Sequence, residues 1–382
     1  MKLPVLRDLT LPTRASTTAR ALFSLAVAQA IEVARRLPGR TTTSALYRAR
    51  VLEPLQRERG LLAWSMTQPS RMSFARCLAL AGTATAEERA AWEDELAAAL
   101  AFDAVRAGIV GELTLSAPPR RFVCERDDVA YDVPRGAAAT LRRESVWVDG
   151  APLEARPAAV RVFADAKLLL VDQNPLAELE AHPDKHGNAL SLGGKPASDW
   201  VASLRASFEI VDAYLPEVAR EMRLVLRHLV PVGWDDERHL SASFLEAVGV
   251  IYLTLHPDLM TMVEALVHEF QHTKLNLMLG FDPLLENGMS PLFSSPVRPD
   301  PRPLRGVVLA VHAFQPIARL YERMIADGKG TARIEARLRQ IAQTCRAGCD
   351  VVLPNAQPTP RGAALFAEMA ALDEELSRHL SA

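Results

Sequence analysis

The stretch "LMTMVEALVHEFQHTKLNLMLG", which begins at residue 259, constrains the fold most, because it predicts one long and largely buried helix. Its apolar residues recur at three- and four-residue spacing, as on a helix that places one face in a core. His268 and His272 lie four residues apart, so one helical turn presents both imidazoles on the same side. The stretch therefore predicts a metal-binding helix inside a packed protein.

The flanking residues bound this helix. Pro257 and Asp258 are typical of a helix start, and Gly280 is typical of the position just after a helix end. The run "EAVGVIYLTL" before them predicts a strand that leads into the helix. Six prolines between 283 and 303 predict a stiff loop, after which helical periodicity resumes at about Leu304.

The remainder of the chain predicts three regions and a mainly helical α+β fold. Residues 1–108 have helical periodicity, with a capping-box pattern at Thr85 and Glu88. Residues 109–195 hold short β-prone runs separated by Pro, Gly and Asp, which predict a small antiparallel sheet. Residues 196–382 return to helices and contain the metal-binding helix, so we expect the catalytic region there.

Composition narrows the classes of function. The 382 residues are 49% hydrophobic and 24% charged, with a formal net charge of −2. This balance gives no electrostatic reason to expect nucleic acid or an anionic membrane as a partner. Four cysteines are too few for a disulfide framework at this length, which favours a reducing cytoplasm. No apolar run reaches the roughly 18 residues of a membrane-spanning helix.

Two histidines rarely complete a catalytic metal site, so a third ligand is expected. His312, in "LAVHAFQPIARLY", is the leading candidate, because Pro316 should distort its helix and it lies among apolar residues. A core histidine bonded to the backbone would have the same sequence context, and both interpretations stay open. The carboxylate alternatives are Glu286, Asp282 and Asp300.

Other candidate ligands are weaker. His-Pro-Asp occurs at 182–184 and at 256–258, spaced like part of an iron-oxygenase triad, but the chain is too helical for the barrel that such triads occupy. The tripeptide is also a common helix start. Cys345 and Cys349 share a helix face, yet without a second ligand pair nearby they are interpreted as ordinary helix residues.

One chemistry that fits His-Glu-x-x-His is zinc peptidase catalysis, in which Glu269 takes a proton from a metal-bound water. Glu269 lies about 100° around the helix from His268, within reach of such a water. The longer protease motif, with a glycine and a third histidine soon after His272, is absent. The zinc peptidase therefore remains the alternative hypothesis.

A wider stretch, about residues 240–325, resembles the HExxH-motif domain of proteins that modify ribosomally synthesised peptides. The resemblance is carried by "ALVHEFQHTKLN" and by "RPDPRPLRG". It implies an iron(II)- and 2-oxoglutarate-dependent dioxygenase, an enzyme of peptide biosynthesis that hydroxylates the β-carbon of a side chain in a precursor peptide. Dioxygen would be the second substrate.

Under this resemblance His268 and His272 would bind iron, with His312 as the proposed third ligand. The distal carboxylate of 2-oxoglutarate needs a guanidinium that can grip both oxygens. The candidates are Arg302 as first choice, Arg298 and Arg305, with Lys274 as a weaker alternative. Glu269 would then orient a bound water or hold a peptide amide. The strand "GVIYLTL" could pair with the peptide as an added sheet edge.

Overall fold

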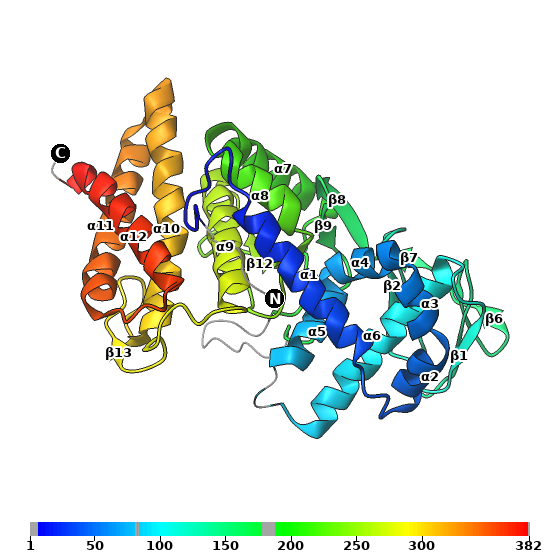
Figure 1. Cartoon of the computed structure of the whole chain (residues 1–382). Helices are drawn as coiled ribbons and strands as arrows, with labels where there is room; N and C mark the ends of the chain where they lie inside the picture. Colours follow the sequence, from blue (N-terminus) through cyan, green and yellow to red (C-terminus); the bar gives the residue numbers. More distant parts are fainter. Residues whose placement is uncertain (1–6, 81, 83, 178–187, 381–382) are drawn as a thin grey trace.

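The computed structural model describes residues 7–80, 82, 84–177 and 188–380. It confirms a mainly helical α+β protein, with twelve α-helices in the described part of the chain and small antiparallel sheets in its middle. Figure 1 shows an elongated molecule in which the last three helices lie at one end, α9 near the centre, and the first helices with the small sheets at the other end. No helix within those ranges is long and apolar enough to cross a membrane.

Six helices form the N-terminal part, where helical periodicity predicted them. They are α1 (Thr18–Arg35), α2 (Thr42–Arg50), α3 (Leu52–Arg57), α4 (Arg59–Thr67), α5 (Pro69–Leu80) and α6 (Ala86–Arg106). The predicted capping box begins α6: Thr85 Oγ1 accepts a hydrogen bond from the Glu88 amide (3.1 Å), and the Glu88 carboxylate accepts one from the Thr85 amide (2.8 Å). This exchange satisfies two groups that a helix start otherwise leaves unpaired.

Short antiparallel strands follow in two small sheets, with the orders β1-β4-β5-β6 and β2-β3-β7. The strands are β1 (Leu113–Leu115), β2 (Arg121–Cys124), β3 (Val129–Asp132), β4 (Ala139–Leu141), β5 (Val146–Val148), β6 (Ala151–Pro152) and β7 (Arg156–Pro157). Phe122 of β2 packs on Phe102 of α6, with 5.3 Å between the ring centroids. The sheets therefore share a core with the N-terminal helices.

A five-stranded sheet of order β11-β12-β10-β9-β8 lies beside α9. The strands are β8 (Ala159–Phe163), β9 (Ala166–Leu169), β10 (His228–Trp234), β11 (Ser241–Ala242) and β12 (Val250–Leu255). β10 pairs in parallel with both β9 and β12, and the two outer pairings are antiparallel. Helices α7 (Ala197–Tyr214) and α8 (Pro216–Val225) connect β9 to β10. The sheet thus draws strands from both sides of residue 195, where the sequence predicted a region boundary.

The predicted strand before the metal-binding helix is β12, but its place in the sheet excludes one predicted role. β12 lies between β10 and β11, and all six of its residues are buried. A peptide that adds a strand needs an exposed sheet edge. The prediction that a peptide pairs along β12 is therefore wrong, because β12 already has a neighbour on each side.

The metal-binding helix is α9 (Leu259–Leu279), close to its predicted bounds. Asp258 caps its start, since Oδ1 accepts hydrogen bonds from the amides of Met260 (2.8 Å) and Thr261 (3.2 Å). Gly280 ends it with an ordinary right-handed φ of −67°. A Cβ atom there would lie 2.6 Å from Arg76 Nη2, so a larger residue would have to displace the end of that side chain.

Beyond α9 the chain crosses the proline-rich loop and forms the C-terminal helices. The loop holds the short pair β13 (Leu292–Phe293) and β14 (Arg302–Pro303). The helices are α10 (Leu304–Met324), which continues through Pro316, a π-helical turn (Ile325–Lys329), α11 (Ala332–Asn355), α12 (Gly362–Leu376) and a final 3-10 turn (Ser377–Leu380). Helix α10 packs on both α9 and α11.

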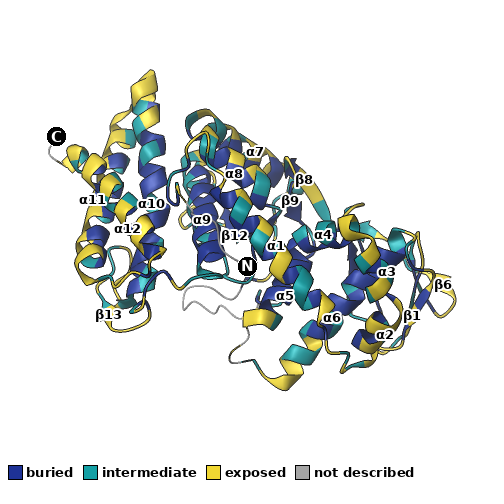
Figure 2. Ribbon diagram, in the orientation of Figure 1, coloured by how far each residue is buried: buried dark blue, intermediate teal, exposed yellow. Residues whose placement is uncertain are grey.

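Two large clusters of buried apolar side chains hold these elements together. One unites α7 to α12 with the five-stranded sheet, and the other unites α2 to α6 with the small sheets. α1 belongs to both, since Leu22 and Phe23 pack in the first cluster and Ala30 and Ala34 in the second. Figure 2 shows α1 crossing between the two halves of the molecule.

A buried charge network also joins the halves. Arg71 of α5 donates to Asp103 of α6 (2.9 Å) and approaches Glu125 at 3.4 Å. His228 of β10 lies 3.3 Å from the other oxygen of Glu125. Burial alone would raise the pKa of Glu125, but His228, Arg71 and Lys167 outweigh burial and lower this pKa to about 2.

Candidate metal centre

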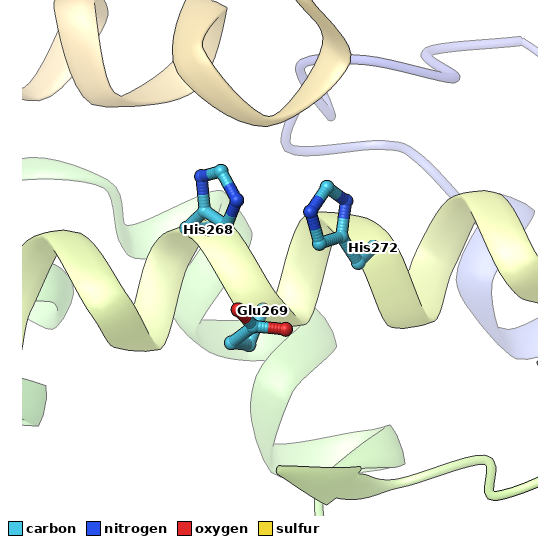
Figure 3. Close-up of side chains that lie close together, drawn as sticks. All are labelled: His268, Glu269 and His272. Atoms are coloured by element: carbon cyan, nitrogen blue, oxygen red, sulfur yellow. The ribbon is translucent and has the colours of Figure 1, made fainter. Parts of the chain in front are cut away.

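The two motif histidines stand side by side on α9, as predicted. Their ring centroids are 4.4 Å apart, and the His268 ring contacts Phe314 of α10 at 5.1 Å. Figure 3 shows both rings on the same side of the helix, facing α10 and the segment before α1. The i to i+4 spacing therefore produces the arrangement that a shared metal ion requires.

Both imidazoles are suited to metal binding in their protonation state. Burial lowers the pKa of His268, and burial together with the neighbouring His268 lowers the pKa of His272 well below its ordinary value. Neutral imidazole is the form that coordinates a metal. His272 Nδ1 is buried and has no hydrogen-bond partner among the residues that the structure describes. A buried unpaired nitrogen is a group that a bound ion would satisfy.

Glu269 has different surroundings from the histidines. It is buried, and its carboxylate accepts hydrogen bonds from Ser241 Oγ (2.6 Å) and Ser243 Oγ (2.8 Å). Figure 3 shows this carboxylate turned away from the two rings. Nevertheless a carboxylate oxygen of Glu269 and one ring nitrogen from each of His268 and His272 all lie within 4.8 Å of one another. In the described ranges this is the one group of three or more potential ligands so close together.

His312 is not in this group. It is fully buried on α10, and its Nε2 donates a hydrogen bond to the Leu9 carbonyl at 3.0 Å. Burial lowers the pKa of His312 to about 3, so this side chain is also neutral. His312 thus bonds to the backbone, and its role as a third ligand stays a prediction.

A cleft of about 750 Å³ opens beside His268. Its walls come from α9, α10, α11 and the loop before β12. The residues that line it are Ser241, Glu264, His268, Phe314, His239, Met260, Thr261, Ala265, Ile317, Tyr321, Thr331, Arg333, Ile334, Ala336, Arg337 and Gln340. The cleft gives small molecules access to the His268 side of the metal centre.

Sequence reasoning missed the charged groups of this cleft. Arg337 of α11 grips the Glu264 carboxylate with two nitrogens, Nε at 2.8 Å and Nη2 at 2.5 Å, and Tyr321 donates to the same carboxylate at 2.6 Å. Arg333 pairs with Asp258, the residue that caps α9. Arg337 is 73 positions from Glu264, so no local spacing indicates their contact.

The arginines predicted from the proline-rich loop lie elsewhere. Arg298, Arg302 and Arg305 are not among the residues of the cleft wall, and Arg302 pairs with Asp300 at 2.9 Å. Contacts between Glu264 and Tyr321, and between His268 and Phe314, show that α9 and α10 run antiparallel. Arg305 is therefore about 14 Å along α10 from Phe314, at 1.5 Å per residue.

The other predicted candidates also lie outside the ligand group. Glu286 and Asp300 are exposed, and Asp282 accepts hydrogen bonds from Thr359 and Arg361. Residues 182–184 are outside the described residues. The second His-Pro-Asp begins a helix, as expected, because its aspartate caps α9. Both Cys345 and Cys349 are free and buried in α11, in agreement with their interpretation as ordinary helix residues.

The donor set fits a divalent transition metal. Two neutral imidazoles on one helical turn are ligands that non-haem iron sites and zinc sites share. The comparisons with known proteins do not choose between these metals: no protein-family model matches the chain, and no curated protein matches it.

Proposed function

We propose that this protein is an iron(II)- and 2-oxoglutarate-dependent oxygenase that hydroxylates a side-chain β-carbon of a ribosomally synthesised precursor peptide. The observation that carries the proposal is the asymmetry of the motif. Its two histidines lie side by side, with His268 at the wall of a cleft, whereas its glutamate is bound to two serines. Bound iron would supply the oxidation of the peptide by dioxygen, coupled to decarboxylation of the keto acid.

In this proposal His268 and His272 hold the ion, with His312 retained from the sequence as a candidate third ligand. Iron sites of this kind keep open positions for small molecules. The cleft beside His268 leaves room for a keto acid and for the target side chain. Phe314 supplies an apolar contact beside the ligand ring, which excludes water from that side.

We propose Arg337, in place of the loop arginines, as the group that binds the distal carboxylate of 2-oxoglutarate. It already binds one carboxylate in bidentate geometry, that of Glu264, inside the cleft. Such paired hydrogen bonds are the mode by which arginine recognises carboxylates. Tyr321, which donates to the same carboxylate, would assist in that recognition.

The same asymmetry weighs against a zinc peptidase. A general base must lie within hydrogen-bond reach of the water it deprotonates. Glu269 instead accepts two serine hydroxyls on the side of α9 away from the rings. The resulting role is structural: the carboxylate fastens α9 to the segment of β11. We assign the activity to the cytoplasm, where the four free cysteines and iron(II) both stay reduced.

The test is a mass measurement. Protein purified without air is mixed with iron(II), 2-oxoglutarate, dioxygen and peptides encoded by small reading frames adjacent to its gene. The proposal predicts a peptide product heavier by one oxygen atom, with succinate formed in equal amount. Peptide fragments would indicate the zinc peptidase instead, and an unchanged peptide with unchanged keto acid would indicate a binding protein without this activity.

A further inference from the structure

The segment before α1 lies directly against the His272 side of the metal centre. Leu9 and Thr10 are buried, with contacts to α9, α10 and α12. In Figure 1 this dark-blue segment occupies the space between α9 and α10. Figure 3 shows it passing next to His272. The cleft at His268 and this segment thus lie on opposite sides of the histidine pair.

Side chains hold this segment by its main chain. Glu368 Oε2 accepts hydrogen bonds from the amides of Leu9 (2.6 Å) and Thr10 (3.0 Å). In the other direction, His312 Nε2 donates to the Leu9 carbonyl (3.0 Å), and Lys274 Nζ donates to the Asp8 carbonyl (3.0 Å). Contacts of this kind bind a main chain independently of its side chains, and the main chain here turns at Asp8, whose φ is +58°.

The groups that hold this main chain are themselves enclosed by the fold. Lys274 is fully buried, and its nearest carboxylate is that of Glu221 at 2.9 Å. Buried charges destabilise a fold unless they are well paired, and an apolar contact would anchor a terminal segment at lower cost. Leu9 packs in the main core, and Leu11 packs against it.

We propose that the groove lined by Lys274, His312 and Glu368 is the binding channel for a peptide main chain, and that residues 8–10 occupy it as an internal competitor. The occupant that the channel takes is a peptide main chain with an apolar side chain at the position of Leu9. The inference rests on the proposed function for the identification of this peptide as the substrate. The channel itself rests on the contacts alone.

An internal competitor weakens binding of an external peptide, because its effective concentration reaches the millimolar range. Removing the competitor while keeping the channel should therefore increase peptide affinity. Leu9→Asp places a carboxylate in the apolar position and releases the segment, while Lys274, His312 and Glu368 remain. Arg7→Asp is the matched control, since it adds the same carboxylate to the same segment at an exposed position.

The probe is a labelled synthetic peptide, Arg-Asp-Leu-Thr-Leu-Pro-Thr, which copies residues 7–13. Its affinity for metal-free full-length protein is measured by fluorescence anisotropy. We expect at least tenfold tighter binding to Leu9→Asp than to the wild type or to Arg7→Asp. Methylation of the peptide amides that match Leu9 and Thr10 should abolish binding, because these amides donate to Glu368, whereas methylation at the next leucine should not.

Hydrogen exchange of the wild type provides a measurement that needs no variant. The amides of Leu9 and Thr10 should be protected in the free protein and should exchange at least tenfold faster when the peptide is saturating. Absence of peptide binding, or binding with unchanged exchange at these two amides, would overturn the proposal. The binding assay needs no metal, so it tests the channel separately from the oxygenase. If the peptide binds but the iron-loaded protein does not hydroxylate it, the oxygenase is refuted and the channel is retained.

Discussion

At the scale of single residues, Glu269 decides between the two chemistries that its motif allows. Its two hydrogen bonds come from neutral hydroxyls, those of Ser241 and Ser243. Glutamine can replace both bonds, since its amide oxygen accepts from one serine and its amide nitrogen donates to the other. The Glu269→Gln substitution therefore removes a base while it preserves the hydrogen bonds between α9 and the two serines.

We accordingly expect Glu269→Gln to lower kcat/KM for peptide hydroxylation by less than about tenfold, because the residue has no proton to take. Loss of a general base typically costs a factor of about 10² to 10⁴. Turnover is measured by mass spectrometry of the peptide, with the exposed Glu335→Gln as control. A loss of a thousandfold or more, with the fold intact, would restore the peptidase hypothesis.

Substitution of Arg337 and substitution of Arg302 should have different effects on the affinity for 2-oxoglutarate. Lysine keeps the charge of arginine but cannot grip a carboxylate with two parallel hydrogen bonds. Arg337→Lys should weaken 2-oxoglutarate binding by about tenfold, which corresponds to roughly 1.4 kcal/mol. Arg302→Lys should leave it unchanged. Calorimetric titration of the iron-loaded protein measures both, and the reverse order would assign the keto acid to the proline-rich loop.

Local spacing was enough to predict the histidine pair, but not its surroundings. His268 and His272 meet because a helix repeats every 3.6 residues, which depends on no distant contact. The serines that hold Glu269 lie 26 and 28 positions away, and Arg337 lies further still. Such partners are fixed by tertiary packing, and a single serine or surface arginine has no distinctive pattern in the sequence.

At the scale of elements, α9 is oriented by its first turn. Asp258 accepts two amide hydrogen bonds there, and it also binds Arg333 of α11. The cap thus connects the metal-binding helix to the opposite wall of the cleft. Helix bounds of this kind were predictable, because capping residues are adjacent to the helix they end.

Asp258→Ala should therefore lower the free energy of unfolding by about 1 kcal/mol, the usual effect of losing an N-terminal cap. The same change should strengthen 2-oxoglutarate binding, since the cleft loses a negative charge and Arg333 loses its anionic partner. Thermal unfolding and calorimetry measure the two effects. Asp236→Ala, at an exposed position in the loop before β11, is the control. An unchanged unfolding temperature would contradict the structural role of the cap.

Sheet order could not be predicted in the same way. The parallel pairing of β9 with β10 joins segments separated by α7 and α8, and no turn between them fixes the register. For this reason the strand before α9 was predicted as an available edge, whereas it is an interior strand. Alternation of apolar residues indicates that a strand is buried but not which neighbours bury it.

At the scale of the whole molecule, the network around Glu125 joins the N-terminal helices to the sheet beside α9. The pKa of Glu125 is about 2 in the folded protein, below the ordinary value of 4.5. A lowered carboxyl pKa stabilises the fold above the ordinary value, and this stability is lost as the pH falls from 4.5 toward about 2.

The pH dependence of unfolding should therefore be reduced when the carboxyl is removed. We expect the free energy of unfolding of the wild type to fall more steeply between pH 4.5 and pH 2 than that of Glu125→Gln. Denaturant unfolding at several pH values measures both free energies. Subtracting one from the other at each pH removes the contribution of the other carboxylates, which the two proteins share. Equal slopes for the two proteins would show that Glu125 keeps an ordinary pKa in the folded protein.

The most direct test of the central claim is the visible spectrum of protein purified without air and mixed with iron(II) and 2-oxoglutarate. If His268 and His272 hold an iron ion that the keto acid also binds, a weak charge-transfer band appears. The band should be missing in His268→Ala and in His272→Ala, and present in the control His379→Ala, whose histidine pairs with Glu322 at the far end of α10. The account would be contradicted if the wild-type protein bound iron(II) but showed no such band with 2-oxoglutarate. It would also be contradicted if the protein bound zinc in preference to iron(II).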